Sequence, residues 1–195
     1  MSVRLAVRAA GAVLGVSLIA APASAQPAKP GDASEGSART FVQGFYDWYV
    51  GQMRAAAKSK AGAGFGFNDA IRRKPEAFSP ELKRLLEEDY AAASKCKDDV
   101  VGLDWDPFLE TQDSPGTYAA GKVEKTAHGF RVSVDVKDFK ARGVRNPAAQ
   151  ADVAFVGGRW TFVDFGEEPT DPKAWQGLVA ILKGYERSGE YKCGR

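Results

Sequence analysis

The hydrophobic pattern of this chain changes its period near Gly116. Before that residue, apolar side chains recur every three or four positions, as they do along one side of an amphipathic helix. After it they alternate with polar side chains, which is typical of a half-buried antiparallel strand. The alternation is clearest where Phe130, Val132, Val134 and Val136 are separated by Arg131, Ser133, Asp135 and Lys137. Helices followed by such strands predict an α+β fold, in which N-terminal helices pack on an antiparallel sheet.

The first helix is predicted over residues 38–58 and has a wide apolar side. Its apolar residues fill an arc of roughly 200° on a helical wheel, which suits a helix lying in a concave sheet. They are Phe41, Val42, Phe45, Tyr46, Trp48, Tyr49, Val50 and Met53. Aromatic residues at this spacing either form a core or line a ligand pocket, and the core is favoured. The candidate pocket residues of the whole chain are Phe45, Trp48, Tyr49, Trp105, Trp160 and Phe162.

A second helix is predicted to begin at Ser79-Pro80-Glu81, which supplies a capping hydroxyl, a proline and an acid. It should end near Lys97. Its predicted buried side is formed by Leu82, Leu85, Leu86 and Tyr90. The preceding glycine-rich segment 61–67 lacks the spacing of a phosphate-binding loop, so we interpret it as a flexible loop. Asn68 is predicted to cap a short turn that ends near Pro75.

Four strands and a last helix complete the expected order. The strands are predicted over residues 118–126, 130–137, 151–155 and 160–165. The first pair should turn at Ala127-His128-Gly129 and the last pair at Gly157-Gly158, a two-residue hairpin signal. Pro172 is predicted to open a helix that runs to Ser188, with an apolar side. That side is formed by Trp175, Leu178, Val179, Ile181, Leu182 and Tyr185.

Residues 1–25 have the pattern of a cleaved secretory signal peptide. Arg4 and Arg8 precede an apolar run, and small residues stand before a cleavage site at Gln26. The run is shorter than the ~20 residues that span a bilayer, so a cleaved signal is favoured over a membrane anchor. We expect a flexible leader over 26–37, a single domain over 38–195 and a periplasmic or secreted product. No cysteine stands at the cleavage site, so no lipid anchor is expected.

Removing the signal makes the charge of the chain neutral. The 27 basic residues include Arg4 and Arg8, so 25 remain against 25 acidic residues. A neutral chain has no excess of positive charge with which to bind phosphate groups. This argues against nucleic acid as a partner and against a polybasic membrane-surface site. No transmembrane segment is expected in the mature chain, no cofactor is indicated, and the oligomeric state is left open.

The two cysteines, Cys96 and Cys193, both lie in the mature chain. An even number of cysteines in an exported protein favours one disulfide. The alternative is a redox or metal pair, but the chain has no Cys-x-x-Cys motif and only one histidine, which argues against zinc. That histidine, His128, is expected in an exposed turn, where it cannot serve a catalytic triad.

An acidic segment precedes the strands, with five aspartates between Asp98 and Asp113. Asp104, Asp106 and Asp113 are weak candidates for calcium ligands, but their spacing departs from that of an EF-hand. The favoured interpretation is a structural loop, because Asp106-Pro107 is a turn signal.

Asp164 is the strongest of three weak candidates for a catalytic base, ahead of Asp104 and Asp106. It is predicted to share a strand face with Trp160 and Phe162, where burial would raise its pKa. A charge on an apolar face calls for a partner, so a buried ion pair with an Arg or Lys is favoured over catalysis.

Three segments together resemble a family of small exported bacterial proteins known as a domain of unknown function. They are Phe45-Tyr46-x-Trp48-Tyr49, the loop from Asp104 to Asp113, and the strand from Trp160 to Phe165. The resemblance covers residues 38–193. It implies a cystatin-like or nuclear-transport-factor-2-like fold, in which a curved sheet and a helix enclose a cone-shaped cavity. Members are often lipoproteins, and this chain departs from them in lacking the acylated cysteine. The family has no established catalytic residues to carry over.

These observations favour a non-catalytic binding or accessory protein of the cell envelope. Its partner would be an envelope protein or a small molecule, bound by the concave sheet or by the acidic loop. One alternative is an enzyme that uses a carboxylate in the cone. Another is an inhibitor or immunity protein that inserts a loop such as residues 61–67 into a secreted enzyme.

Overall fold

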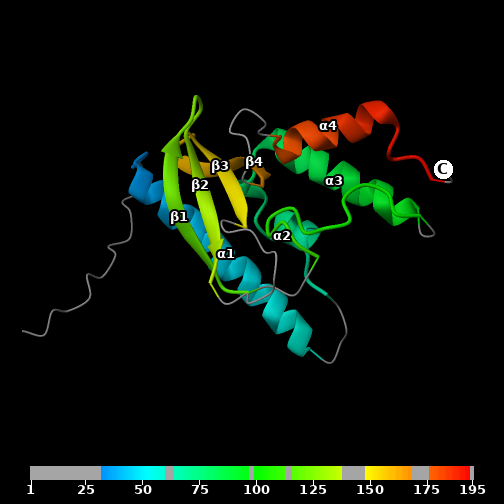
Figure 1. Cartoon of the computed structure of the whole chain (residues 1–195), viewed down its shortest axis with the longest axis horizontal. Helices are drawn as coiled ribbons and strands as arrows, with labels where there is room; N and C mark the ends of the chain where they lie inside the picture. Colours follow the sequence, from blue (N-terminus) through cyan, green and yellow to red (C-terminus); the bar gives the residue numbers. More distant parts are fainter. Residues whose placement is uncertain are drawn as a thin grey trace, which may run out of the picture.

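The structure is a computed structural model that describes residues 32–59, 64–96, 99–112, 116–137, 148–167 and 176–193. The predicted signal peptide and residues 26–31 of the predicted leader lie outside the described residues. The helices and strands follow the predicted order (Figure 1). They are α1 (Glu35–Lys58), α2 (Phe67–Arg73), the 3-10 turn η1 (Pro75–Ala77), α3 (Pro80–Lys95), β1 (Tyr118–Lys125), β2 (Phe130–Val136), β3 (Ala149–Val156), β4 (Arg159–Gly166) and α4 (Leu178–Ser188).

The four strands form one antiparallel sheet in the order β1-β2-β3-β4. Each strand pairs with the next one in the sequence. The turn between β3 and β4 places Gly157 and Gly158 at φ angles of 59° and 81°, which only glycine adopts at low cost. The predicted α+β class and the predicted glycine hairpin are therefore confirmed.

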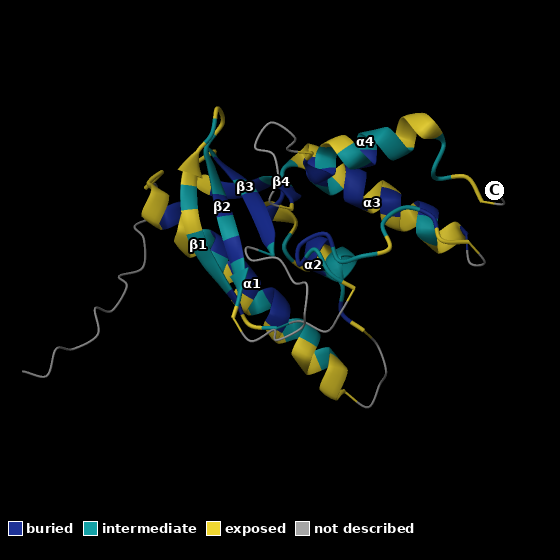
Figure 2. Cartoon of the chain, viewed as in Figure 1, coloured by how far each residue is buried: buried dark blue, intermediate teal, exposed yellow. Residues whose placement is uncertain are grey.

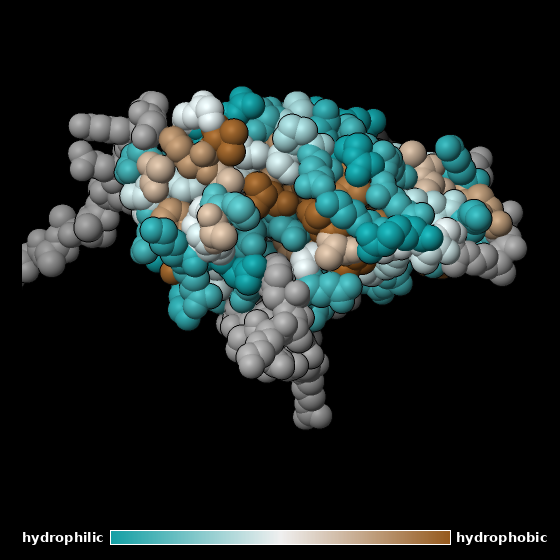
Figure 3. Space-filling model, turned by 90° about the horizontal axis from the view of Figure 1, so that it is seen from above, coloured by the Kyte–Doolittle hydropathy of each residue, from teal (hydrophilic) through white to brown (hydrophobic). Residues whose placement is uncertain are grey.

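Helix α1 lies across one face of this sheet, and its buried side faces the strands (Figures 1 and 2). The fully buried large residues of this core come from α1, α2, α3, the loop after α3, β4 and α4. From α1 the core takes Val42, Phe45, Tyr46, Tyr49 and Val50, with Phe41, Trp48 and Met53 partly buried beside them. The predicted wide apolar side of this helix is confirmed. Hydrophilic side chains cover most of the face seen from above, with hydrophobic ones gathered near its centre (Figure 3).

Polar side chains of α1 also bond the outer edge of β1. The Gln43 amide accepts a hydrogen bond from Ala120 N at 2.8 Å and donates one to Tyr118 O at 3.2 Å. Arg39 Nε donates to Gly121 O at 3.0 Å. An open edge strand exposes backbone groups that pair with other chains. Helix α1 therefore occupies this edge as well as covering the face.

Helix α1 begins earlier than residue 38, where the sequence placed its start. It begins at Glu35 because the Ser34 hydroxyl accepts a hydrogen bond from Ser37 N at 3.3 Å, which satisfies a free donor of the first turn. The last residues assigned to the flexible leader are therefore helical.

The start of α2 also differs from the prediction. Its first turn is capped at Gly66, whose N–H donates to the Asp69 carboxylate at 3.2 Å, and not at Asn68. The Asp69 carboxylate, at the third helical position, accepts the backbone N–H of the cap residue itself.

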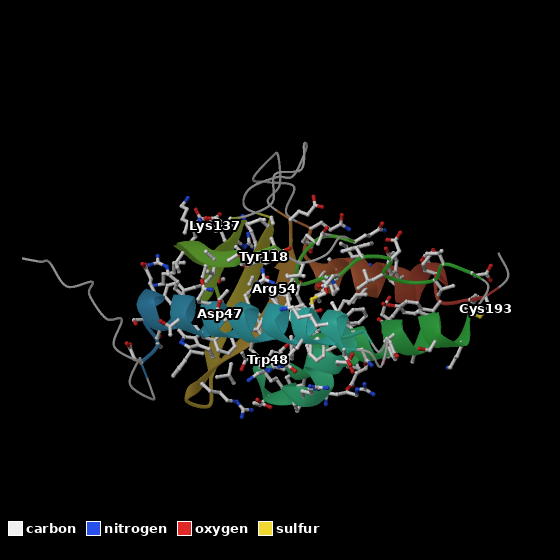
Figure 4. All side chains as sticks on the ribbon, turned by 90° about the horizontal axis from the view of Figure 1, so that it is seen from below. Asp47, Trp48, Arg54, Tyr118, Lys137 and Cys193 are labelled. Carbon is white, nitrogen blue, oxygen red and sulfur yellow. A yellow bond between two sulfur atoms is a disulfide. The ribbon has the colours of Figure 1, made fainter. Side chains whose placement is uncertain are left out.

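Helices α3 and α4 lie side by side and run in the same direction. Arg84 Nη1 contacts Glu186 Oε1 at 2.8 Å, and further along both helices Cys96 and Cys193 form a disulfide. The predicted disulfide is confirmed, and Cys193 lies at the end of the molecule away from the sheet (Figure 4).

The start of α4 and the exposure of Tyr90 on α3 bear on two of the predictions. Pro172 and Trp175 lie outside the described residues, and α4 begins at Leu178 after Gly177. Tyr90 was predicted to be buried, but it is 45% exposed, which makes that prediction wrong. Its ring meets Phe67 edge-on at 6.3 Å between centroids, so it covers the rim of the core.

A β-bulge changes the face of Asp164. Asp152 pairs with Asp164, but the next β3 residue, Val153, pairs with Phe162, so β4 holds one extra residue. Phe162 and Phe165 are therefore both fully buried although they are three positions apart. The prediction that Asp164 shares a face with Phe162 is wrong, because the bulge turns Asp164 toward the opposite face.

Candidate functional site

The region between α1 and the sheet is packed with aromatic rings. Phe45 lies 4.7 Å from Phe162, 5.5 Å from Phe108 and 5.6 Å from Phe78 between ring centroids, and it stacks on Tyr49. These rings are 0–4% exposed. Of the candidate pocket residues, Phe45, Tyr49 and Phe162 are therefore core residues in this arrangement.

The remaining candidate pocket residues lie in different places. Trp160 is 8% exposed and its Nε1 donates to Ser37 Oγ at 2.9 Å. Trp48 is partly buried on α1, with Lys74 Nζ 4.8 Å from its ring centroid (Figure 4). Trp105 lies in the loop after α3, so the structure does not gather the six aromatic residues into one site.

The loop 103–112 is organised by the side chain of Asp106. Its Oδ1 accepts hydrogen bonds from Phe108 N at 2.9 Å and Leu109 N at 3.1 Å. Its Oδ2 accepts a short hydrogen bond from the Tyr49 hydroxyl. Burial raises the pKa of Asp106, whereas these three donors oppose that shift. Both oxygens are engaged, which favours a structural role for this carboxylate.

Tyr46 holds the same loop from the neighbouring turn of α1. Its hydroxyl donates to Phe108 O at 2.6 Å, and burial raises its pKa well above the ordinary value. Phe108 and Leu109 are 0% and 1% exposed, so the loop inserts its tip into the core. The loop is therefore held by both hydrogen bonds and apolar contacts.

Glu110 has an unusual backbone and an unusual carboxyl. It is the non-glycine residue with a positive φ among the described residues, at 50°. Burial, together with the nearby carboxylates of Glu167 and Asp106, raises the pKa of its side chain to about 8. A strained residue with a perturbed carboxyl is common at functional sites. Sequence reasoning did not select Glu110, and neither feature has a sequence signal.

A shallow hollow of about 540 Å³ opens beside this loop, and we call it the loop hollow. Apolar side chains from α1, α2 and the loop form most of its wall, with two carboxylates and other polar groups among them. Its residues are Met53, Gly66, Phe67, Leu103, Asp104, Trp105, Asp106, Thr111 and Gln112. Asp104 is exposed and accepts a hydrogen bond from Gln112 Nε2 at 3.1 Å. Sequence reasoning found the acidic and aromatic loop residues and missed Met53 and Phe67.

The calcium candidates are only partly visible. Asp113 lies outside the described residues, Asp104 bonds Gln112, and Asp106 binds three protein donors. Among the described residues, no group of three or more His, Cys, Asp or Glu side chains is placed to hold a metal ion.

Asp164 caps helix α4 from the neighbouring strand. Its Oδ1 accepts hydrogen bonds from Val179 N and Phe165 N, both at 2.9 Å. Burial raises its pKa to about 6, although these two donors oppose the shift. Gly177 is required beside it, since a Cβ there would lie 1.9 Å from Asp164 Oδ2. Backbone donors therefore take the hydrogen bonds of Asp164, while Arg131, which bonds Asp152 at 2.6 Å, is near enough to lower the pKa of Asp164.

Two further candidates are placed by the structure. His128 is exposed in the turn between β1 and β2, as predicted. Residues 61–63 of the glycine-rich loop lie outside the described residues. At the end of that loop Phe65 is 8% exposed, and the Arg73 guanidinium lies 5.0 Å from its ring centroid.

Comparison with family models, with curated proteins and with solved structures gives no match for this chain. None of the described helices combines the length and the apolar character that a membrane crossing requires.

The buried carboxyls predict that the protein is more stable in mild acid than in base. Burial raises the pKa of Glu110 to about 8 and the pKa values of Asp89 and Asp164 to about 6. An acid whose pKa is higher in the folded state binds its proton more tightly there than in the unfolded chain. This stabilisation is complete below the unfolded pKa, near 4, and is lost as the pH rises through 6 to 8.

We therefore expect the free energy of unfolding, measured by urea titration at constant ionic strength, to fall by about 1–3 kcal/mol from pH 5 to pH 9. Glu110→Gln should flatten the part of this curve between pH 6 and 9. Glu87→Gln, on the exposed side of α3, is the control and should leave the slope unchanged. A wild-type stability that stays constant or rises over this range contradicts the prediction.

Proposed function

We propose that this chain is a non-catalytic binding module that holds a small ligand in the loop hollow. The observation that carries the proposal is the contrast between two regions. The space under α1 is filled with aromatic rings, whereas the loop hollow combines partly exposed apolar side chains with carboxylate oxygens. Small-molecule sites combine an apolar wall with a few convergent polar groups in this way.

The chemistry of the hollow favours a ligand with an apolar body and a positive charge. Among the described residues, its charged lining residues are Asp104 and Asp106, and no described Lys or Arg lines it. Phe67 and Trp105 supply ring faces that attract a cation. Asp106 and Asp164 already accept hydrogen bonds from backbone donors, which supports binding over acid–base chemistry by these groups.

We further propose that the protein is exported. The disulfide between Cys96 and Cys193 supports this, because such bonds persist in oxidising compartments. Membership of the exported family described above also stays a proposal. The feature that supports it is a helix lying across one face of a four-stranded antiparallel sheet.

The test uses benzyltrimethylammonium as the probe and benzyl alcohol as its neutral counterpart. Binding is followed by the indole N–H signal of Trp105 in ¹H–¹⁵N NMR spectra, assigned with the Trp105→Phe variant. We expect a saturable shift with the cation and at least ~5-fold weaker binding in Asp104→Asn, since a carboxylate contributes to a cation–aromatic site. Glu124→Gln, an exposed carboxylate on β1, is the matched control and should bind as the wild type does. A Trp105 signal that does not move up to 50 mM probe, or that moves equally with benzyl alcohol, contradicts the proposal.

A further inference from the structure

A second and better enclosed groove shares no lining residue with the loop hollow. It has a volume of about 700 Å³ and runs between the first turns of α3 and the end of the β3–β4 hairpin. It is lined by Pro75, Phe78, Ser79, Pro80, Lys83, Arg84, Glu87, Val156, Gly157, Arg159, Thr161 and Val163. The packing of the core and the proposed ligand site in the loop hollow do not explain this groove.

The apolar part of this groove is partly open to solvent. Val156 is 59% exposed, and among the described residues only Tyr90 and Val100 are other large hydrophobic side chains that stand out in this way. Val163 and Pro80 lie on the same lining. A single exposed apolar side chain is ordinary on a protein surface, but several of them together in a groove with a polar rim are typical of a protein-binding surface.

The same groove carries an excess of positive charge. Lys83, Arg84 and Arg159 line it against one carboxylate, Glu87. Arg84 is occupied by Glu88 and Glu186, at 2.6 and 2.8 Å.

The other two cations remain accessible to a partner. The Lys83 ammonium lies 3.6 Å from Glu87 in an exposed pair, and such pairs contribute little stability and exchange readily. Arg159 is exposed and pairs across the hairpin with Val156, so the two residues lie on the same face of the hairpin, and both line the groove. Arginine binds carboxylates through two parallel hydrogen bonds and is enriched among residues that dominate binding energy.

We propose that this groove binds an extended acidic segment of a partner protein, in which an apolar residue is flanked by carboxylates. The apolar residue packs on Val156 and Val163. The carboxylates meet Arg159 on the hairpin wall and Lys83 on the helix wall. A span of one apolar side chain with an acid on either side fits a groove of this volume between a helix and a hairpin.

The test is fluorescence anisotropy of a labelled peptide, Gly-Glu-Asp-Leu-Asp-Glu-Gly, with the full-length protein carrying its disulfide. Two comparison peptides have Lys in place of every acid, or Ser in place of the leucine. We expect the acidic peptide alone to bind, and to bind at least ~10-fold more weakly at 300 mM than at 50 mM salt, as screening of charge contacts requires.

Variants at the two walls separate charge from shape. Arg159→Glu and Lys83→Glu should each weaken the acidic peptide by about 10-fold, and Val156→Ser by about 5-fold. All three positions are exposed or partly exposed, so the fold should persist, which circular dichroism verifies. Arg187→Glu makes the same charge change on α4 outside the groove and should change binding less than 2-fold.

Several results overturn the inference. They are no binding of the acidic peptide up to 1 mM, equal binding of the basic or serine peptide, or binding that survives both charge reversals. A fourth is binding of phosphatidylglycerol vesicles that is lost in Arg159→Glu while the peptide does not bind, which assigns the groove to a membrane surface.

Discussion

Asp106→Ala is expected to lower the free energy of unfolding by about 3 kcal/mol, because it removes the acceptor of three hydrogen bonds at once. Phe108 N, Leu109 N and the Tyr49 hydroxyl would each lose their partner in a partly buried loop. Loss of the turn also loosens Phe108, which contacts Phe45, Phe78 and Phe165 in the core. Urea unfolding followed by tryptophan fluorescence measures the change.

Conservative variants divide this effect between its parts. Asp106→Asn keeps an oxygen for the two backbone donors and should cost about 1 kcal/mol or less, whereas Tyr49→Phe removes one bond to a carboxylate and should cost about 1–2 kcal/mol. In a double-mutant cycle, Asp106→Ala and Tyr49→Phe should be less than additive, since they break the same contact.

Asp104→Ala is the matched control, because Asp104 is an exposed aspartate of the same loop, bonded only to the Gln112 side chain in the described structure. It should change stability by no more than about 0.5 kcal/mol. If the Asp106 and Asp104 variants cost the same, Asp106 does not organise the loop.

The periodicity that located the helices and strands did not locate the bulge in β4. The run Trp160-Thr161-Phe162-Val163-Asp164-Phe165 was interpreted as regular alternation, which places Asp164 beside Phe162. Two phenylalanines three positions apart cannot both reach one face of a regular strand, so this spacing was the available signal. Pairing with β3, which the sequence of β4 alone does not contain, decides where the extra residue goes.

The acidic loop shows the same limit for the site. Its aspartates and Trp105 stood out in the sequence, because acids and a tryptophan before a proline are unusual. Met53 did not, since it follows the helical pattern of a core residue, and Phe67 did not, since it ends the segment interpreted as a flexible loop. Both become walls of the loop hollow only when α1, α2 and the loop meet. Glu110 depends on burial and on a neighbour more than fifty positions away, Glu167, and both are products of the fold.

Removing the disulfide is expected to have the largest effect of all on stability. Helices α3 and α4 both start at β4, where Ser79 N donates to Phe162 O at 2.8 Å and Val179 N donates to Asp164 at 2.9 Å. At their other ends, Cys96 and Cys193 are joined across a sequence separation of 97 residues. The bond therefore closes a loop that includes the whole sheet. For a loop of this length, restriction of the unfolded chain is worth about 4–5 kcal/mol in the chain-entropy model.

The variant Cys96→Ala with Cys193→Ser should therefore lose about 4 kcal/mol of unfolding free energy, measured by urea titration. Alanine is chosen at position 96 because Cys96 is only 4% exposed, whereas Cys193 is exposed. Cys96 forms a small apolar cluster with Ala92, Val101 and Tyr191, separate from the main core. Amide exchange should consequently rise first in the last turns of α3 and α4, and last in β2 and β3.

Reduction of the wild type with dithiothreitol provides the matched control, because it opens the same loop without changing any other atom. The reduced wild type and the double variant should unfold at the same urea concentration, and dithiothreitol should leave the variant unchanged. If reduction leaves the wild-type midpoint where it was, the unfolded chain is not restrained by this bond. The stability of the helix pair then rests on its own contacts, such as Arg84 with Glu186. Exchange confined to the helix ends, with an unchanged midpoint, would likewise contradict the expected global effect.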